Sequence, residues 1–475
     1  MIRTTLLLLL VAYLSVYAWR NWFVSLCGAI LLLAVVQHPD FPNSIGGIQG
    51  ANPWNFLLLM VFLAASSERQ QQGREWDMPA CAGWMLLGYL FVVLSAAFRL
   101  MLEPPVAPDH TVMSIISEDL INCIKWVIPG LLLFDACRTR QRVLIALVVI
   151  LLLYFLIALQ VIKCMPLGSA VSGDALSARA SKITQSNIGY NRVTLSMMLA
   201  GASWAMLALL PLAKRNIHKI SLMAAAGIVA LGQALTGGRT GYVTWAAVGL
   251  VLAVVRWRKL LPLIPAAVLL TVALLPAVRE RMLQGLGGSR GNIAVQTDSY
   301  EMTSGRNLAW PRVIDKIQDS PLIGYGREGM STTGIKEGLW EELQESFPHP
   351  HQAYFEILLD NGIIGFLLVV PFYLYCLRRS FQLLGDRIDA LNAAVGGVSV
   401  ALILALMIGA MGGQTFYPRE GAVGMWAAIG LMLRVSVDWN WAKETGYPMY
   451  QEEECEQEME FAPEWPANTY AANLN

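Results

Sequence analysis

A succession of apolar blocks, nearly free of charge and long enough to cross a bilayer, dominates this chain of 475 residues. A transmembrane helix needs about 20 apolar residues, because each residue adds about 1.5 Å along the helix axis. The first two blocks are short and are separated by Arg20 and Asn21, so we predict 12 or 13 transmembrane helices. The expected fold class is an all-α, polytopic helical membrane protein. The blocks lie near 4–19, 22–37, 53–67, 79–101, 113–134, 142–162, 190–212, 218–235, 241–255, 260–278, 352–377, 388–411 and 419–436.

Composition excludes several other classes of protein. Only 14% of the residues are charged and 56% are hydrophobic, whereas ordinary soluble proteins carry roughly 25% charged residues. A soluble enzyme and a nucleic-acid-binding protein are therefore excluded. The seven cysteines are scattered and form no C-x-x-C pair, so they support neither a zinc site nor a disulfide framework.

The formal net charge of zero is the sum of two unlike parts of the chain. Residues 436–475 hold nine carboxylates and the single Lys443, a balance of −8, so residues 1–435 carry +8. The acidic segment is polar and of low complexity, which is typical of a solvated, disordered tail. An interaction arm is the alternative interpretation.

Lysine and arginine predict the orientation of the spans, since short basic loops stay in the cytoplasm. Basic residues cluster in alternate loops, for example Arg138, Arg140 and Arg142 in one and Arg256, Arg258 and Lys259 in another. The intervening connections are assigned to the outside face. They are 38–52, 102–112, 163–189, 236–240, 279–351 and 412–418.

Four segments follow from this assignment. Residues 1–278 form transmembrane helices, 279–351 form one large outside loop, 352–436 form the C-terminal spans, and 437–475 form the acidic cytoplasmic tail. Residues 1–18 could pass for a signal peptide, but an equally apolar block follows at once, so we favour an uncleaved anchor.

The large loop contains a predicted helix. Its start, residues 285–292, is rich in glycine, but from Gly305 apolar residues recur at helical spacing. They are Leu308, Trp310, Val313, Ile314 and Ile317, and the proline and glycines of 320–326 end the helix. We expect a small structured cap on the membrane surface rather than an inert connector.

Two arginines on the outside face are candidate phosphate ligands. Arg239 lies in the short turn LTGGRTGY (235–242), where glycines allow a ligand to approach the backbone. Arg306 lies in SGRNLAW (304–310), where Ser304 is a plausible N-cap and the helix N-terminus favours anions. A guanidinium can clamp a phosphate with its planar fork. The alternatives are an arginine that reaches lipid headgroups and a surface arginine without a partner.

A pair of histidines precedes the next span. His349 and His351 lie in PHPHQAYFEILLDNGIIG (348–365), and the prolines around His349 hold the backbone extended. The spacing does not fit a metal pair at i and i+4, so a zinc site is weakly supported. A histidine titrates near neutrality and can take a proton from an attacking hydroxyl. Interfacial histidines of an aromatic belt are the alternative.

The block at 113–126 is unusually polar for a span, with Glu118, Asp119 and Lys125. Charges facing lipid are costly, so these side chains must line a cavity or pair internally, for instance Glu118 or Asp119 with Lys125. We expect a structural role or a cavity wall.

Taken together, the two arginines and the two histidines favour transfer from a lipid-linked pyrophosphate donor. The arginines would hold the diphosphate and stabilise it as it leaves, and a histidine would activate an acceptor hydroxyl. The chain contains neither a D-x-D motif, typical of metal-assisted nucleotide-sugar chemistry, nor a G-x-x-x-x-G-K-[ST] phosphate loop.

At these residues the sequence resembles the bacterial O-antigen ligase and polymerase superfamily, which includes exopolysaccharide polymerases and protein O-oligosaccharyltransferases. The resemblance covers about 185–435 and rests on three motifs in order: TGGRTGY (236–242), SGRNLAWPRVIDKIQDSPLIGYG (304–326) and HPHQAYFEILLDNGIIG (349–365). One departure is Gln352, where the family usually has Asn.

We expect an inner-membrane enzyme with its active site facing the periplasm, and we expect no cofactor and no metal. The resemblance also implies roles for single residues. Arg239 and Arg306 would contact the pyrophosphate of an undecaprenyl-linked glycan. His351 would be the acceptor-activating base or a positioning group, with His349 as its neighbour. Other polysaccharide-assembly proteins are possible partners.

The acceptor stays open within this resemblance. A ligase uses a lipid A-core sugar, a polymerase a lipid-linked repeat, and an oligosaccharyltransferase a Ser or Thr. A different class of function, a transporter or flippase of lipid-linked sugars, is the alternative. Such proteins usually show internal repeats and charges near the midplane, neither of which is evident here.

Overall fold

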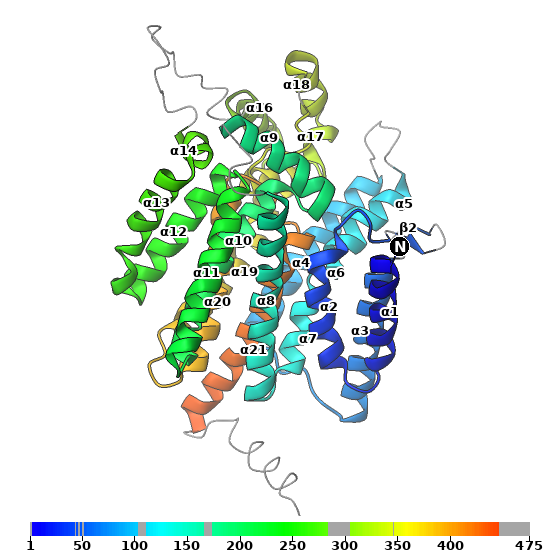
Figure 1. Ribbon diagram of the computed structural model, residues 1–475. Helices are drawn as coiled ribbons and strands as arrows, with labels where there is room; N and C mark the ends of the chain where they lie inside the picture. The colour runs from blue at the N-terminus through cyan, green and yellow to red at the C-terminus, as the bar shows by residue number, and fades with distance from the viewer. Residues whose placement is uncertain are drawn as a thin grey trace, which may run out of the picture.

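The computed structural model describes residues 2–42, 44–45, 48–49, 52–102, 111–165, 173–283, 305–344 and 346–445. Within these ranges the chain is a helical bundle, with one short antiparallel pair, β1 (Ser44–Ile45) and β2 (Ile48–Gln49) (Figure 1). The N-terminal half comprises α1 (Ile2–Tyr17), α2 (Trp22–Val36), α3 (Pro53–Gln71), α4 (Ala80–Leu102), α5 (Val112–Ile115), α6 (Asn122–Lys125), α7 (Ile128–Ala136), α8 (Arg140–Cys164) and α9 (Gly173–Ile183).

The second half of the described chain supplies the central helices and the large loop. Its helices are α10 (Arg192–Ala208), α11 (Asn216–Leu235), α12 (Arg239–Val255), α13 (Leu263–Leu274), α14 (Pro276–Leu283), α16 (Arg306–Asp319), α17 (Gly329–Thr332), α18 (Ile335–Leu343), α19 (Ala353–Leu384), α20 (Ala390–Gly409) and α21 (Val423–Thr445). Most of α10, α20 and α21 is buried, and α20 packs against α10, α19 and α21. These helices form the centre of the bundle.

The expected fold class is confirmed: the chain is an all-α, polytopic membrane protein. In the described part of the chain, seven helices are long and apolar enough to cross a membrane. The pair α13 and α14, bent by 116°, would make an eighth. The predicted number of 12 or 13 is higher because α1, α2 and α12 are apolar but shorter, and α3 is apolar only in its first part.

The polar block at 113–134 is helical but is not one continuous span. It is divided into α5, the π-helical segment η1 (Ile116–Ile121), α6 and α7. A π-helical segment is a common feature of functional sites, because the extra residue per turn redirects the side chains around it. Glu118 and Asp119 both lie in η1.

The loops separate into two groups at opposite ends of the bundle. At one end, Arg140 pairs with Asp389 at 2.9 Å, and Asp77 pairs with both Arg138 and Arg434. These residues adjoin loops predicted to be cytoplasmic. Helices α16, α17 and α18 lie at the other end, at the top of Figure 1. The large loop therefore lies at the opposite end of the bundle from these basic loops.

Residues of the large loop form a small hydrophobic core of their own. Ala309 and Val313 of α16 pack with Met330, Ile335, Leu339, Phe347 and Leu359. The predicted apolar face is partly wrong, since Leu308 and Ile314 are exposed while Ala309 is buried. The helix also begins differently: Gly305 is its N-cap, with φ of 74°. Ser304, the predicted N-cap, lies outside the described residues.

The last helix extends beyond the predicted start of the tail. We expected residue 437 to begin a disordered segment, but α21 continues to Thr445. Residues 446–475, which contain most of the acidic tail, lie outside the described residues.

Candidate functional site

The turn that carries Arg239 is shaped by glycines and by close packing on α10. Gly237 has φ of 65°, a left-handed conformation that favours glycine. A Cβ on Gly238 or Gly241 would overlap Ser196, whose hydroxyl donates a hydrogen bond to the Gly238 carbonyl at 3.3 Å. The backbone therefore lies directly against α10, and Arg239 becomes the first residue of α12.

Arg306 is brought to the same place by the loop helix. It is the first residue of α16, and its Nη2 donates to the Gly412 carbonyl at 3.4 Å. A Cβ on Gly412 would in turn overlap Thr240, the neighbour of Arg239. Burial and then the charge of Arg239 lower the pKa of Arg306. The two arginines singled out by sequence are therefore neighbours, although 66 positions separate them in the chain.

Two further arginines that sequence reasoning missed extend this group. Arg192, the first residue of α10, interacts electrostatically with Arg239 and Arg281. Arg281 donates from Nε to the Gly237 carbonyl at 3.3 Å. Both lie at the predicted outside end of an apolar helix. The same feature made Arg239 a candidate in the sequence. We call Arg192, Arg239, Arg281 and Arg306 the arginine cluster.

The arginine cluster combines fixed charge with helix N-termini. Helices α10, α12 and α16 all begin with an arginine of the cluster. Free backbone N–H groups and the helix dipole make each helix N-terminus favourable for an anion. Arg306 Nε is buried without a hydrogen-bond partner among the described residues, so one strong donor is still available.

His349 and His351 lie together, near Arg306. Their ring centroids are 4.2 Å apart, and Phe347 packs edge-on against His351. Burial and then Arg306 lower the pKa of His351 to about 4. Burial first, followed by His351 and nearby arginines, lowers the pKa of His349 to about 2. Both rings are therefore neutral near pH 7.

A hydrogen bond distinguishes the two histidines. The His351 backbone N–H donates to His349 Nδ1 at 3.1 Å, and His351 adopts the left-handed conformation with φ of 53°. A neutral imidazole has one donor and one acceptor nitrogen. With Nδ1 accepting, His349 carries its proton on Nε2 and acts as a donor. This assignment leaves His351 as the better candidate for a base.

The histidine segment is held by α16 and by the start of α19. Trp310 Nε1 donates to the Pro350 carbonyl at 3.0 Å, and its ring packs edge-on against Phe355. Gln352 Oε1 accepts from the Phe355 backbone N–H at 3.0 Å and caps α19. Gln352, which stands where the family usually has Asn, thus caps the helix. Asn is the more usual residue in this role.

The segment 349–365 packs against the end of the segment 304–326. Helix α19 is broken at Gly362, which has φ of 61°. At the break, the N–H groups of Ile363 and Ile364 donate to the carbonyls of Pro321 and Leu322. A Cβ on Gly362 would overlap Leu322, so glycine is required there. This junction fixes α16 relative to α19, and hence Arg306 relative to His351.

A buried ionic network centred on Arg327 lies near His349. Arg327 contacts Glu356 at 2.9 Å and Asp119 at 3.1 Å, and its guanidinium lies 3.7 Å from the Tyr417 ring centroid. Tyr417 donates to Asp360 at 2.9 Å. Asp119 thus pairs with Arg327 rather than with Lys125.

A polar cavity of about 680 Å³ adjoins His349. Its walls include Glu118, Asp119 and Lys125, so the expectation of a cavity wall fits this block. Lys125 Nζ donates to Asn55 Oδ1 at 3.2 Å. Arg419 also lines this cavity and acts electrostatically on His349, although sequence reasoning gave it no role.

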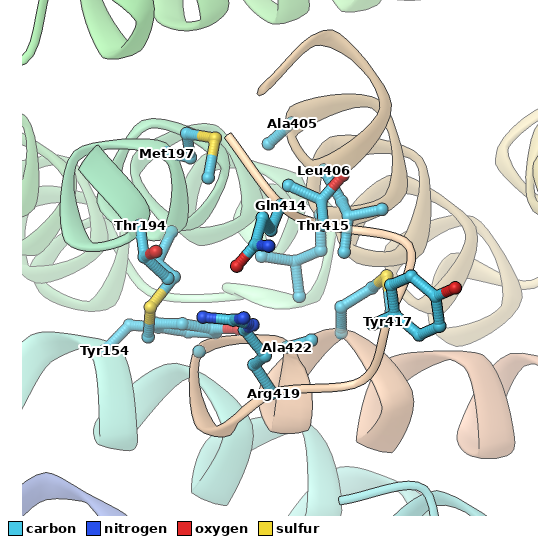
Figure 2. Close-up of a pocket in the computed structure, with 14 residues that line it drawn as sticks. Tyr154, Thr194, Met197, Ala405, Leu406, Gln414, Thr415, Tyr417, Arg419 and Ala422 are labelled. Atoms are coloured by element: carbon cyan, nitrogen blue, oxygen red, sulfur yellow. The ribbon is translucent and has the colours of Figure 1, made fainter. Parts of the chain in front are cut away.

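Arg419 also borders a smaller pocket of about 40 Å³ between α10, α20 and α21. Figure 2 shows its side chain extending toward Tyr154, with Gln414 directed into the same pocket. Gln414 donates to Glu356 at 2.6 Å, which links this pocket to the ionic network. Among the described residues, no group of three or more His, Cys, Asp and Glu side chains is placed to hold a metal ion.

Comparison with known families identifies the region that contains these residues. Residues 223–370 match the family model described as O-antigen ligase. The chain therefore carries a domain of the O-antigen ligase and polymerase superfamily. The superfamily predicted from the three motifs is confirmed over this region, which holds Arg239, Arg306, His349 and His351. No curated protein matches the chain. The family is associated with glycosyltransferase-type ligase and polymerase chemistry.

Proposed function

We propose that the protein transfers a glycan from an undecaprenyl-pyrophosphate donor to an acceptor hydroxyl on the periplasmic face of the bacterial inner membrane. The observation that carries this proposal is the proximity of Arg306 to both Arg239 and His351: it interacts electrostatically with each of them, and Trp310 on the same helix bonds to Pro350, the residue before His351. A pyrophosphate bound by the arginines would place the donor's reacting carbon beside a neutral histidine. Residues 279–351 would form the periplasmic cap, and residues 437–475 would face the cytoplasm.

The arginine cluster supports a pyrophosphate ligand. Arginine binds phosphate through two parallel N–H donors, and these bonds are stronger than those between neutral groups. Four guanidiniums close together repel one another, so an anion relieves the repulsion when it binds. They also supply the positive charge that a leaving pyrophosphate needs, so the proposal requires no metal ion.

An apolar groove beside the cluster supports a lipid-linked donor. It has a volume of about 600 Å³ and lies among α11, α12, α13 and α14. Tyr242 and Met282 line it, and each is close in sequence to a cluster arginine, Arg239 or Arg281. A ligand with a phosphate head and a hydrocarbon chain matches this combination of charge and apolar surface.

The proposed reaction is a displacement at the donor sugar. His351 takes the proton of the acceptor hydroxyl, and the acceptor oxygen bonds to the donor's anomeric carbon. The bond between that carbon and the pyrophosphate oxygen breaks, and undecaprenyl pyrophosphate leaves with the electron pair. His349, which donates from Nε2, positions the acceptor. Bound pyrophosphate offsets the charge of Arg306, so donor binding would make His351 a stronger base.

The arrangement supports transfer over transport. The cluster and the histidines lie at one end of the bundle, whereas a transporter places its charged site near mid-depth between repeats. We also predict that other polysaccharide-assembly proteins bind this protein.

Glycan transfer in proteoliposomes tests the proposal. Arg239→Ala, Arg306→Ala and His351→Ala should each reduce transfer by at least about 100-fold, as expected for loss of a group that stabilises developing charge. Arg312→Ala is the matched control, since Arg312 lies on α16 but pairs with Glu342. The control should keep the wild-type rate. Wild-type rates in all three site variants would contradict the proposal.

A further inference from the structure

The polar cavity beside His349 is separate from the arginine cluster. Its lining includes Pro348, His349 and Pro350 but not Arg239, Arg306 or His351. Residues far apart in sequence form its walls, among them Asn52, Asn122, Gly329 and Glu420. A volume of about 680 Å³ falls within the usual range of small-molecule sites. The cavity is therefore a second binding space beside His349, whose ring centroid lies 4.2 Å from that of the candidate base His351.

The charge of this cavity is opposite to that of the arginine cluster. Six carboxylates and three cationic side chains line it among the described residues. They are Glu118, Asp119, Glu328, Glu356, Asp360 and Glu420, against Lys125, Arg327 and Arg419. Arg327 is already engaged by Asp119 and Glu356. An anionic ligand would thus meet excess negative charge, whereas the arginine cluster attracts it.

The remaining side chains suit sugar hydroxyls. Glu118 is exposed in η1, and among the described residues no hydrogen bond or ion pair engages its carboxylate. A carboxylate accepts strong hydrogen bonds from hydroxyl groups. Asn122 adds an amide with both donors and acceptors, and Trp126 adds an aromatic ring. Acid, amide and aromatic groups together favour a carbohydrate over a phosphate or a hydrocarbon chain.

We propose that this cavity binds the acceptor glycan and selects an acceptor whose terminal sugars carry no negative charge, either neutral or amino sugars. The inference rests on the proposed glycan transfer, for which it names the acceptor class. The terminal sugar enters between Glu118 and Trp126, and its reactive hydroxyl reaches His351 past His349. Glu118 and Glu420 exclude phosphorylated and uronate-bearing acceptors by like-charge repulsion.

Separate kinetic constants for donor and acceptor test the location of the site. The assay uses the purified full chain in proteoliposomes, lipid-linked glycan from the producing cells as donor, and a neutral fragment of the same glycan as acceptor. Glu118→Gln and Trp126→Leu should each raise the acceptor KM at least fivefold and leave the donor KM unchanged. Arg306→Lys should mainly raise the donor KM. Glu341→Gln, an exposed carboxylate on α18 outside the cavity, is the control and should change neither constant.

The charge selectivity is tested with the same fragment after phosphorylation of its terminal sugar. The wild type should prefer the neutral form at least tenfold, and the double variant Glu118→Gln with Glu420→Gln should reduce that preference. Equal use of both acceptors by the wild type, or an unchanged acceptor KM in folded cavity variants, would overturn the inference. If the wild type transfers no glycan to any acceptor, the proposed function itself fails, which is a different result. Melting temperatures in detergent confirm that each variant is folded.

Discussion

The indole Nε1 of Trp310 donates a hydrogen bond of 3.0 Å to the backbone carbonyl of Pro350. This bond connects α16, which begins with Arg306, to the residue directly before His351. The arginine that would hold the donor and the histidine that would activate the acceptor are thus fixed relative to each other by a third side chain. Trp310 is therefore a positioning residue in the proposed mechanism.

Replacing Trp310 by Phe should slow transfer without unfolding the protein. The aromatic ring is kept, but the hydrogen bond to Pro350 is lost, a change of about 1 kcal/mol. Because 1.4 kcal/mol corresponds to tenfold, we expect kcat to fall about fivefold. Trp340→Phe, on the exposed surface of α18, is the control. An unchanged kcat in Trp310→Phe would show that this bond does not position the site.

The two histidines should respond differently to substitution by glutamine. His351→Gln removes the proposed base and should abolish measurable transfer. His349→Gln keeps a side-chain amide that can accept from the His351 N–H and donate to an acceptor, so part of the activity should remain. Rate measurements on both variants at saturating donor compare them directly. Equal losses would contradict the separate roles assigned to the two rings.

The pH profile of transfer should reveal the state of His351. Its pKa is lowered to about 4 by burial and by Arg306, so the neutral, active form is lost only as the pH falls through about 4. Removing the charge of Arg306, as in Arg306→Gln, should move this acid limb upward toward 6.5. The profile of kcat/KM for the donor, taken from the residual activity, measures the shift. A limb that moves down, or does not move, would contradict the proximity of the two groups.

A pair of compensating substitutions tests whether the close contact between Gly241 and Ser196 holds the Arg239 turn in place. Gly241→Ala would overlap the Ser196 hydroxyl and displace the Arg239 turn. Overpacking of this kind costs about 1–3 kcal/mol. Adding Ser196→Gly opens the space again, so the double variant should recover much of the transfer rate and of the melting temperature. Gly227→Ala, with open space around the glycine, is the matched control.

The buried Arg327 should be essential for folding. Arg327→Met would leave the Asp119 and Glu356 carboxylates buried without their cation. Breaking a buried ion pair on one side costs about 3–5 kcal/mol. By contrast, Arg312→Met breaks an exposed pair with Glu342, which is worth about 0–1 kcal/mol. Thermal unfolding in detergent should show a large loss of stability for the first variant and almost none for the second.

The sequence singled out four residues that the structure brings close together, but it did not show how they are held in place. Arg239, Arg306, His349 and His351 stood out because polar residues at the outside ends of apolar helices are few and costly. Arg192 and Arg281 carry the same signal but lie outside the three motifs, so they were overlooked. The hydrogen bond from Trp310 to Pro350 depends on how α16 packs on α19, which no local pattern contains.

For the membrane spans, too, the sequence predicted one property and missed another. Hydropathy correctly located the apolar helices, because it follows directly from composition along the chain. It could not show that the block at 113–134 is interrupted by the π-helical η1, or that α13 and α14 meet at 116°. Both breaks depend on backbone geometry and tertiary packing rather than on the average polarity of a segment.

Glycan transfer by this protein is tested most directly by measuring the release of undecaprenyl pyrophosphate together with acceptor-linked glycan, in proteoliposomes that contain only this protein. The wild type should yield equal amounts of the two products, and Arg306→Ala and His351→Ala should yield neither. If labelled lipid-linked glycan instead crosses the bilayer, with no acceptor consumed and no undecaprenyl pyrophosphate released, the protein is a transporter and not a glycosyltransferase.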